Sequence, residues 1–186
     1  MTSGLTEVRF HGRGGQGAWT ASRLLAQAGL KEKRFIQSFP SFGPERAGAP
    51  ITAFTRISDT PIHIHSSVYE PDVVVVLDPT LLGTSVIEGV KPDTKLVVNT
   101  KMSPLELKES LALLANEVWT LDATSLALKV LNRPITNTAM LGAVVKATTI
   151  VDLKSLLEVA EIRFTGRIKE PNLEVIRRSY EEVVMG

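Results

Sequence analysis

The chain has 186 residues, 44% of them hydrophobic, and a formal net charge of +1 at pH 7. These values fit one folded domain spanning residues 1–186, and they give no reason to expect binding to nucleic acid or to a membrane surface. The absence of cysteine excludes disulfides, a cysteine nucleophile and cysteine-ligated iron–sulfur clusters in this chain.

The first predicted elements are a strand, a glycine-rich loop and a helix. Residues 8–11 alternate between apolar and polar side chains, which indicates a strand. The loop 12–17 follows, and residues 18–30 then carry helix formers with apolar residues at helical spacing. Residues 35–39 form the second predicted strand.

An irregular loop separates this second strand from the next one. Residues 40–50 contain three prolines and two glycines, which excludes a helix or a central strand. Residues 51–57 alternate again, and the turn 58–60 leads into 61–64. We therefore predict a hairpin formed by 51–57 and 61–64.

Strands and helices alternate through the middle of the chain. Four consecutive valines within 72–78 indicate a strand covered on both faces, as in a parallel sheet. Ser103 and Pro104 suit the cap and first turn of a helix that runs to about 115. The other predicted elements here are a short helix at 81–90 and strands at 95–99 and 118–121.

Helices dominate the rest of the chain, and they complete the predicted fold. They are expected at about 123–131, 138–147, 153–160 and 172–184, with Asp152 and Asn172 as caps. The last helix is amphipathic, so its apolar side docks on this domain or on a partner. The alternation of strands and helices predicts the α/β class, as a three-layer α/β/α domain with a mostly parallel, mixed sheet.

The ends and the apolar runs of the chain bear on its location. The short polar start, Met1–Thr6, does not look like a signal peptide. Apolar runs such as 73–77 are far shorter than the roughly 20 residues of a membrane span. We therefore expect a cytoplasmic protein.

The glycine-rich loop is the main candidate for a binding site. Gly12, Gly14 and Gly17 have the G-x-G-x-x-G spacing between a strand and a helix. Glycine lets the backbone approach a ligand closely, and the first amide groups of a helix attract anions. Arg13 adds a charge that can bind phosphate oxygens. The loop points to a phosphate-bearing ligand or a partner's cofactor, with a tight turn that binds nothing as the alternative.

A nicotinamide dinucleotide site is another reading of this loop, and the sequence tests it. Such sites usually place Asp or Glu about 20 residues on, at the end of the second strand, to hold the ribose. The stretch 36–40 has no acid, and Gln16 is larger than the residue usual at its position. Both observations argue against a free-standing NAD-binding dehydrogenase, which stays an alternative.

The proline-rich loop is the second candidate. Loops after the carboxyl ends of strands line the ligand crevice in doubly wound sheets, so this loop and the glycine loop should face the same end of the sheet. Arg46 and Arg13 can then meet one anionic group, and Glu45 can fix an arginine or accept a hydrogen bond. The alternative is a rigid surface loop whose charges are solvated.

Several single residues have simpler explanations. His11 is expected to be a hydrogen-bonded strand end or, alternatively, a proton shuttle. His63 and His65 would share one face of a strand, but no further ligands for a metal are evident. Asp78 and Asp122 follow strands and either cap helices or contact a ligand. We predict no catalytic residue and no metal site in this chain.

Two motifs together resemble a known family. His-Gly-Arg-Gly-Gly-Gln-Gly at 11–17 resembles one signature of the gamma subunit of 2-oxoacid:ferredoxin oxidoreductases, and the segment 42–50 resembles the second. Residues 71–82, 137–143 and 177–183 are similar to the same family in the same order. The resemblance therefore covers almost the entire chain.

The second signature is similar to the pyruvate type of this family. Ketoisovalerate and indolepyruvate types tend to place arginine two positions after the glutamate, followed by two glycines. This chain has Ala47 there, with Arg46 directly after Glu45. Pyruvate is thus the expected substrate, with a ketoisovalerate-type or other 2-oxoacid:ferredoxin oxidoreductase as the alternative.

The resemblance implies a subunit that does not act alone. Enzymes of this family decarboxylate a 2-oxoacid oxidatively on thiamine diphosphate, pass electrons through iron–sulfur clusters to ferredoxin, and form acyl-coenzyme A. Thiamine diphosphate, Mg and the clusters are implied to lie on partner subunits, among the alpha, beta and delta chains. The gamma-type domain is implied to bind part of coenzyme A. The lack of cysteine agrees with this division.

The resemblance and the residues together define the expected site. Asn137 and Thr138 are expected to add polar contacts from a helix start, with plain N-capping as the alternative. Arg46 is expected to contact coenzyme A or to face the thiamine-bearing subunit, and Glu45 is expected to be a cofactor-binding residue beside it. The remaining residues, which are expected to hold the coenzyme A phosphate, are Gly12, Arg13, Gly14, Gly15, Gln16 and Gly17.

Overall fold

A seven-stranded sheet crosses the part of the chain that the computed structural model describes, residues 4–41, 48–113 and 115–186. The strands lie side by side in the order β2-β3-β1-β4-β5-β6-β7. Their bounds are Leu5–Arg13 (β1), Phe35–Pro40 (β2), Pro50–Ser58 (β3), Val73–Val76 (β4), Lys95–Asn99 (β5), Val118–Leu121 (β6) and Val184–Met185 (β7).

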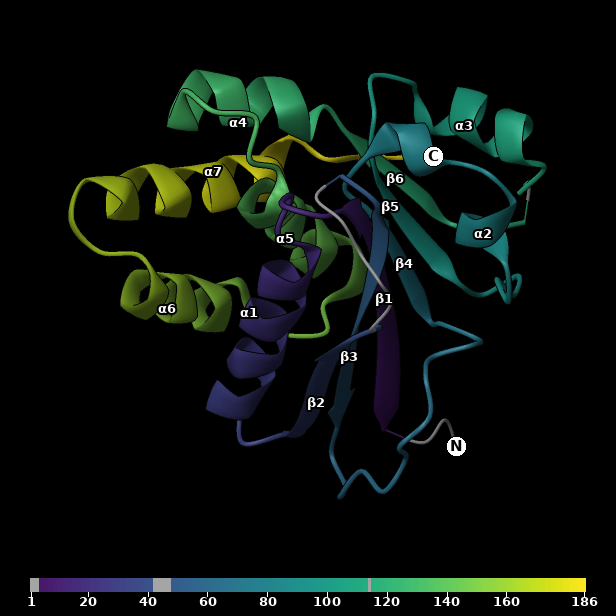
Figure 1. Cartoon of the computed structure of the whole chain (residues 1–186), viewed down its shortest axis with the longest axis horizontal. Helices are drawn as coiled ribbons and strands as arrows, with labels where there is room; N and C mark the ends of the chain where they lie inside the picture. The colour runs from purple at the N-terminus through teal and green to yellow at the C-terminus, as the bar shows by residue number, and fades with distance from the viewer. Residues whose placement is uncertain (1–3, 42–47, 114) are drawn as a thin grey trace.

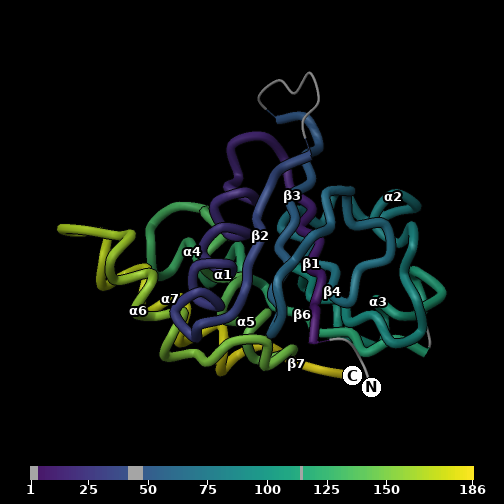
Figure 2. The backbone as a smooth tube through the Cα atoms, turned by 90° about the horizontal axis from the view of Figure 1, so that it is seen from below, coloured from purple at the N-terminus to yellow at the C-terminus, as the bar shows by residue number. Residues whose placement is uncertain are grey.

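Helices cover both faces of this sheet, as Figures 1 and 2 show. Helices α1, α4, α5, α6 and α7 lie on one side, and α2 and α3 lie on the other. Their bounds are Ala18–Lys31 (α1), Thr84–Ile87 (α2), Pro104–Leu111 (α3), Ala123–Leu131 (α4), Asn137–Thr148 (α5), Leu153–Arg163 (α6) and Lys169–Glu182 (α7), with short 3₁₀ helices at Pro79–Leu81 (η1) and Gly166–Ile168 (η2). The predicted three-layer α/β fold is confirmed.

The sheet is mixed, and its parallel part is central. Strands β1, β4, β5 and β6 run parallel, whereas β3 is antiparallel to both β1 and β2, and β7 is antiparallel to β6. In β4, Val73 and Val75 pack into the core under the larger helix layer, and Val74 and Val76 pack under α2 and α3. The valine run is therefore buried on both faces, as expected for a strand between two helix layers.

The predicted hairpin of 51–57 with 61–64 is wrong. Strand β3 pairs with β1 on one edge and with β2 on the other, so neither edge is left for a further strand. Residues 61–65 form no strand, and carbonyl groups of this segment accept hydrogen bonds from the side chains of Gln37 and Arg56. Strands β2 and β3 form the antiparallel hairpin instead, and β3 and β7 are the strands that make the sheet mixed.

The helix ends follow local chemistry where the chain supplies it. Ser103 caps α3, its side chain accepting from the amide of Glu106 while the carboxylate of Glu106 accepts from the amide of Ser103. The helix ends at Leu111 rather than near 115, because Ala112 adopts a left-handed conformation with φ of 53°. The predicted helix 81–90 is shorter, only η1 and α2, since the chain is extended at Gly83.

Helix α7 docks on this domain rather than waiting for a partner. Leu173, Val175 and Ile176 are buried in the main core. Asn172 is not a cap, because α7 begins three residues earlier; its side chain accepts from the hydroxyl of Thr138 at 3.0 Å and donates to the carbonyl of Ile168. The helix ends at Glu182, and the chain continues as β7.

Close approach of α5 and α7 depends on one glycine. A Cβ built on Gly142 would meet the hydroxyl of Ser179 and the carbonyl of Ile176 at distances that no real Cβ adopts. The two helices therefore touch through backbone at this point.

In the described residues, no helix is long and apolar enough to cross a membrane.

Candidate functional site

The glycine loop lies at the carboxyl end of β1, where the helix connections change sides of the sheet. After β1 the chain enters α1 on one face, and after the neighbouring β4 it enters η1 and α2 on the other face. In open α/β sheets this switch between adjacent strands opens the crevice in which ligands bind. The sequence thus places its glycines at the position where the fold offers a site.

The glycines have distinct roles in the loop. Gly15 and Gly17 have positive φ, 95° and 80°, a conformation that other residues rarely adopt. A Cβ on Gly17 would overlap the side-chain nitrogen of Asn137, whereas a Cβ on Gly15 would meet no described residue within 4 Å. Gly17 therefore lets α1 start against α5, and Gly15 leaves open space at the mouth of the loop.

The end of the proline-rich loop lies on the glycine loop. The amide of Gly14 donates to the carbonyl of Ala49 at 2.8 Å, and the amide of Gly48 donates to the carbonyl of Gly14 at 3.2 Å. The expectation that both loops face one end of the sheet is confirmed for these residues. Glu45 and Arg46 lie outside the described residues.

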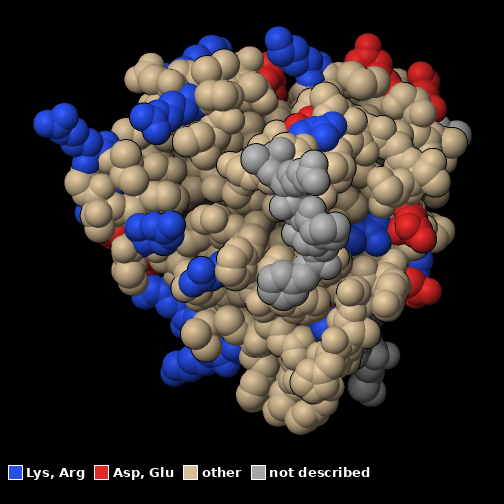
Figure 3. Space-filling view, in the orientation of Figure 1, with Lys and Arg blue, Asp and Glu red and all other residues tan. Residues whose placement is uncertain are grey.

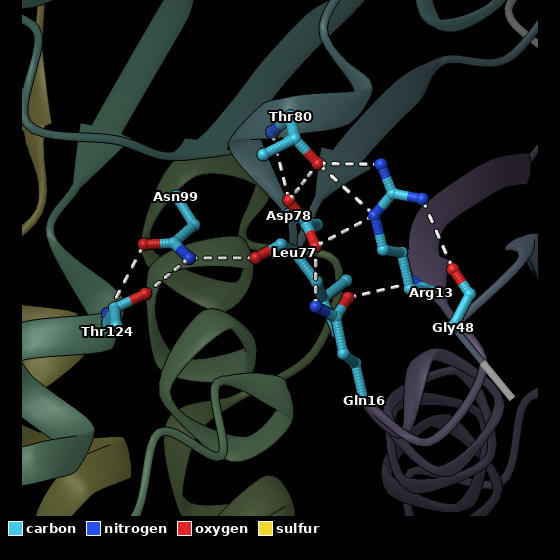
Figure 4. Close-up of polar contacts among 8 residues, drawn as sticks. All are labelled: Arg13, Gln16, Gly48, Leu77, Asp78, Thr80, Asn99 and Thr124. Atoms are coloured by element: carbon cyan, nitrogen blue, oxygen red, sulfur yellow. Dashed lines mark hydrogen bonds and ion pairs between the residues drawn. The ribbon is translucent and has the colours of Figure 1, made fainter.

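Arg13 and Gln16 fold back onto the protein, as Figure 4 shows. The guanidinium of Arg13 pairs with Asp78, Nε to Oδ2 at 3.3 Å, and donates to the hydroxyl of Thr80 at 2.8 Å and to the carbonyl of Gly48 at 3.2 Å. The side chain of Gln16 donates to Asp78 at 2.6 Å and accepts from the amide of Arg13 at 2.7 Å. These contacts tie the loop to the start of η1.

Asp78 holds this network together as an anion. Burial by itself would raise the pKa of Asp78, but hydrogen bonds from Thr80 and Gln16 and the charge of Arg13 outweigh burial, so its pKa lies below the ordinary value. Its carboxylate also accepts from the amide of Thr80 at 2.9 Å, which confirms the expected cap. The positive charge of Arg13 is therefore largely offset by a fixed negative charge.

The amides at the mouth of the loop are less committed. Among the hydrogen bonds within the described residues, none uses the amides of Gly15, Gly17 or Ala18. Gly15 precedes the helix, and Gly17 and Ala18 are the N-cap and the first residue of α1. Donors at the start of a helix suit an anion.

Asn137 and Thr138 differ in what they offer to a ligand. Asn137, at the start of α5, accepts from the amide of Thr138 at 2.8 Å through its side-chain oxygen, while its side-chain nitrogen lies beside Gly17. Thr138 is fully buried and bonds to Asn172. Asn137 is thus the member of this pair that reaches the loop.

A second polar region lies at the same sheet edge, beyond β4. Buried Asn99 donates to the carbonyl of Leu77 at 2.7 Å and to the hydroxyl of Thr124 at 2.9 Å, which links the end of β4 to α4 (Figure 4). A pocket of about 560 Å³ lies next to it, with Lys101 and Asp122 among its lining residues. Asp122 accepts from the amide of Ser125 and so caps α4, as expected.

The histidines lie in different surroundings, one buried and two exposed. His11 is 7% exposed and accepts a hydrogen bond from Nε of Arg9 at 3.0 Å. Burial, and then the charge of Arg9, lowers the pKa of His11 to about 4, so the ring is neutral. His63 and His65 are exposed and lie outside any strand. In the described part of the chain, no group of three acidic, His or Cys residues could hold a metal ion.

The sequence predicts the position of the glycine loop but not the contacts of Arg13 and Gln16 with Asp78, which fix the loop and are here called the loop lock. Asp78 was expected as a cap or ligand contact, and Arg13 as a phosphate contact; their contact with each other joins positions 65 residues apart. The unusual size of Gln16 was the available signal, because a long amide at that position can reach both the backbone of Arg13 and the carboxylate of Asp78.

The fold and site define an α/β domain with a glycine loop at the carboxyl edge of its sheet. Residues 7–182 match the family described as pyruvate ferredoxin/flavodoxin oxidoreductase. The chain belongs to this family.

The relatives correspond to this chain over nearly their full length. The common subunit gamma of the pyruvate/ketoisovalerate oxidoreductases of Pyrococcus furiosus is 50% identical over 179 residues, covering 96% of this chain and 97% of that protein. The pyruvate synthase subunit PorC of Methanocaldococcus jannaschii is 44% identical over 181 residues, covering 97% and 98%. Among solved structures, the Thermotoga maritima pyruvate oxidoreductase subunit PORC superposes with a TM-score of 0.90 at 39% identity, covering 99% of both chains.

These relatives place the chain among gamma-type subunits of 2-oxoacid:ferredoxin oxidoreductases. The correspondence runs from end to end, so the similarity is to whole subunits and not to one shared motif. The alternative of a free-standing dehydrogenase finds no support in these matches.

Proposed function

We propose that this chain is the gamma subunit of a complex that oxidatively decarboxylates pyruvate to acetyl-coenzyme A and reduces ferredoxin. The observation that carries the proposal is the end-to-end correspondence with gamma and PorC subunits, at up to 50% identity. The absence of cysteine fits a subunit whose electron carriers lie on other chains. The chain is then inactive alone and works in the cytoplasm.

The partners follow from the same proposal. Alpha, beta and delta subunits would carry thiamine diphosphate, Mg and the iron–sulfur clusters, and ferredoxin would bind the assembled complex. The relatives named as common to pyruvate and ketoisovalerate oxidoreductases indicate that a gamma subunit can serve more than one 2-oxoacid. We therefore assign the choice of the 2-oxoacid to the other subunits.

The experiment that tests this assignment is copurification from the native organism. A tagged copy of the chain should bring down three other chains together with thiamine diphosphate and iron, and the isolated chain should show no pyruvate oxidation. Recovery of the chain by itself, or with proteins that hold neither cofactor, would refute the assignment.

We further propose that the glycine loop binds a phosphate group of coenzyme A. The pyrophosphate and 3′-phosphate of coenzyme A are anions, and the amides of Gly15, Gly17 and Ala18, which donate no hydrogen bond within the described residues, suit them. Asn137 supplies a side-chain donor next to Gly17. Bound coenzyme A would supply the acyl acceptor, and the part of this chain would be to hold and orient its phosphates.

The other expected residues take supporting roles in this proposal. Gly12, Gly14 and Gln16 shape the loop, and Thr138 holds the start of α5. Arg13 retains a 34% exposed side chain and adds a charge at the loop, although Asp78 offsets much of it. Glu45 and Arg46 remain proposed contacts to coenzyme A or to the thiamine-bearing subunit.

Variants of the assembled complex test coenzyme A binding. Arg13→Ala and Asn137→Ala should each raise the KM for coenzyme A by roughly tenfold, the value of one lost hydrogen bond to a charged group, with the KM for pyruvate unchanged. Arg178→Ala is a matched control, because Arg178 pairs with Glu182 on an exposed surface of α7. An unchanged KM for coenzyme A in both variants, in intact complexes, would defeat the proposal.

A scaffold that binds no small ligand is the second candidate. It is favoured by the observation that Arg13 and Gln16 already satisfy each other and Asp78. Calorimetry with coenzyme A on the chain and on the complex separates the two candidates. If the wild-type complex binds coenzyme A with a measurable heat and the Asn137→Ala complex does not, the result supports the coenzyme A site. Equal heats in the two complexes support the scaffold.

A further inference from the structure

Helices α1 and α6 form an open groove with an apolar floor on the surface of the main helix layer. The groove has a volume of about 430 Å³ and is lined by Gln27, Leu30, Lys31, Val159, Ile162 and Arg163. Leu30 is 58% exposed and Ile162 is 74% exposed. Side chains of this size are usually covered in a working protein when they gather on one surface.

The groove continues along α1 toward the start of that helix. A small hollow next to it is lined by Arg23 together with Gln27 and Arg163, which also line the main groove. Arg23 lies over the ring of Trp19, 5.5 Å from its centroid, and Trp19 is 46% exposed. Trp19, Arg23, Gln27 and Leu30 follow helical spacing, so they form one exposed stripe on α1.

The charge around this groove is positive. Figure 3 shows Lys and Arg side chains gathered over the part of the molecule where α1 and α6 lie. Within the described residues, neither Arg23 nor Arg163 forms an ion pair; each lies over an aromatic ring instead. The nearby acids are already used, since Glu158 pairs with Lys31 and Glu161 pairs with Lys169.

We propose that this α1–α6 groove docks an acidic, amphipathic helix of a partner subunit in the complex. A third helix laid between two helices buries apolar side chains at helical spacing against Leu30 and Ile162. Its carboxylates pair with Arg23 and Arg163, which are preordered by their aromatic neighbours. Trp and Arg are also the residues most often responsible for affinity at interfaces. The proposal rests on the proposed function, because it needs a complex in which a partner exists.

Charge reversal in the assembled complex tests the electrostatic part of this proposal. Arg23→Glu combined with Arg163→Glu should weaken association of the chain with its partner subunits by at least about tenfold, and the loss should be larger at low salt. Leu105→Asp, on α3, is the control for the effect of an added acid on a 62% exposed position away from the groove. Equal association of the double variant and the wild type would overturn the proposal.

A photo-crosslinking residue at position 162 identifies the occupant, and it works in the folded wild-type background. Crosslinks from that position to an acidic segment of another subunit support the proposal. Crosslinks to a second copy of this chain overturn it. The absence of any crosslink from position 162, in a complex that still assembles, also overturns it. If the wild-type chain recruits no partner at all, the proposed function fails together with this inference, whereas assembly without crosslinks at 162 refutes the inference alone.

Discussion

Acid should destabilise this protein through one buried histidine, and replacing His11 should remove that sensitivity. His11 is 7% exposed, and its pKa is lowered from 6.5 to about 4 in the folded chain, first by burial and then by Arg9. The unfolded chain therefore takes up a proton on His11 between these two pH values, while the folded chain does not. Stability from this residue is complete above pH 6.5 and is lost as the pH falls toward 4.

The size of the effect follows from the two pKa values. The interval between 6.5 and about 4 corresponds to about 3 kcal/mol of folding free energy at most. Between about pH 7 and about pH 4.5, the loss should be about 2 kcal/mol. In His11→Gln, which keeps an acceptor for Arg9, this part of the acid sensitivity should vanish.

Urea unfolding of both proteins at the two pH values gives the measurement. Carboxylates also titrate in this range, so the relevant quantity is the difference between the wild type and His11→Gln in how much stability each loses. His63→Gln, at an exposed position, should behave like the wild type. An equal acid loss in wild type and His11→Gln would show that burial of His11 does not govern the acid response.

Three further predictions test the packing, the loop lock and a helix cap. Gly142→Ala should lower the free energy of unfolding, measured by urea titration, by about 1–3 kcal/mol, because its Cβ would clash with the backbone of α7. Gly83→Ala is the control and should cost far less, because a Cβ at Gly83 would meet no described residue within 4 Å. Asp78→Asn should cost about 1–3 kcal/mol near neutral pH by removing the charge that holds Arg13. The lowered pKa of Asp78 stabilises the fold at a pH above the pKa of this group in the unfolded chain, and this stability is lost as the pH falls. The difference in unfolding free energy between the wild type and Asp78→Asn should therefore shrink in acid, and a difference that does not change with pH would contradict the prediction. Ser103→Ala should lower the melting temperature in calorimetry by an amount equivalent to about 1 kcal/mol, and no shift would mean that the capping box is not formed in solution.

The sequence predicted those elements whose signals are local. The valine run of β4 required cover on both faces, and the helix starting at Ser103 carried its own cap. The predicted hairpin with 61–64 was wrong because strand pairing depends on segments that are distant in the sequence. Both edges of β3 pair with β1 and β2, so no edge remains for 61–64. The prediction of Asn172 as a cap was wrong because the side chain bonds to Thr138, 34 positions away, and local spacing does not reveal that contact.

The candidate site likewise has features that local sequence predicts and a contact between distant residues that it does not. The spacing of glycines and the strand before them located the loop correctly, since both are properties of adjacent residues. The pairing of Arg13 with Asp78 brings two connections together across neighbouring parallel strands, and the sequence gives no spacing rule for such a contact. The charge that offsets Arg13 thus comes from Asp78, for which the sequence indicates either a helix cap or a ligand contact.

The outermost strands of the sheet have a consequence for how the free chain behaves before assembly. At one border, β7 offers only Val184 and Met185, so few peptide groups are left unsatisfied there. At the opposite border, β2 ends in Pro40, which has no amide hydrogen to donate. Short or proline-terminated borders discourage chains from joining sheet to sheet. These two borders therefore give another copy of the chain little backbone with which to extend the sheet.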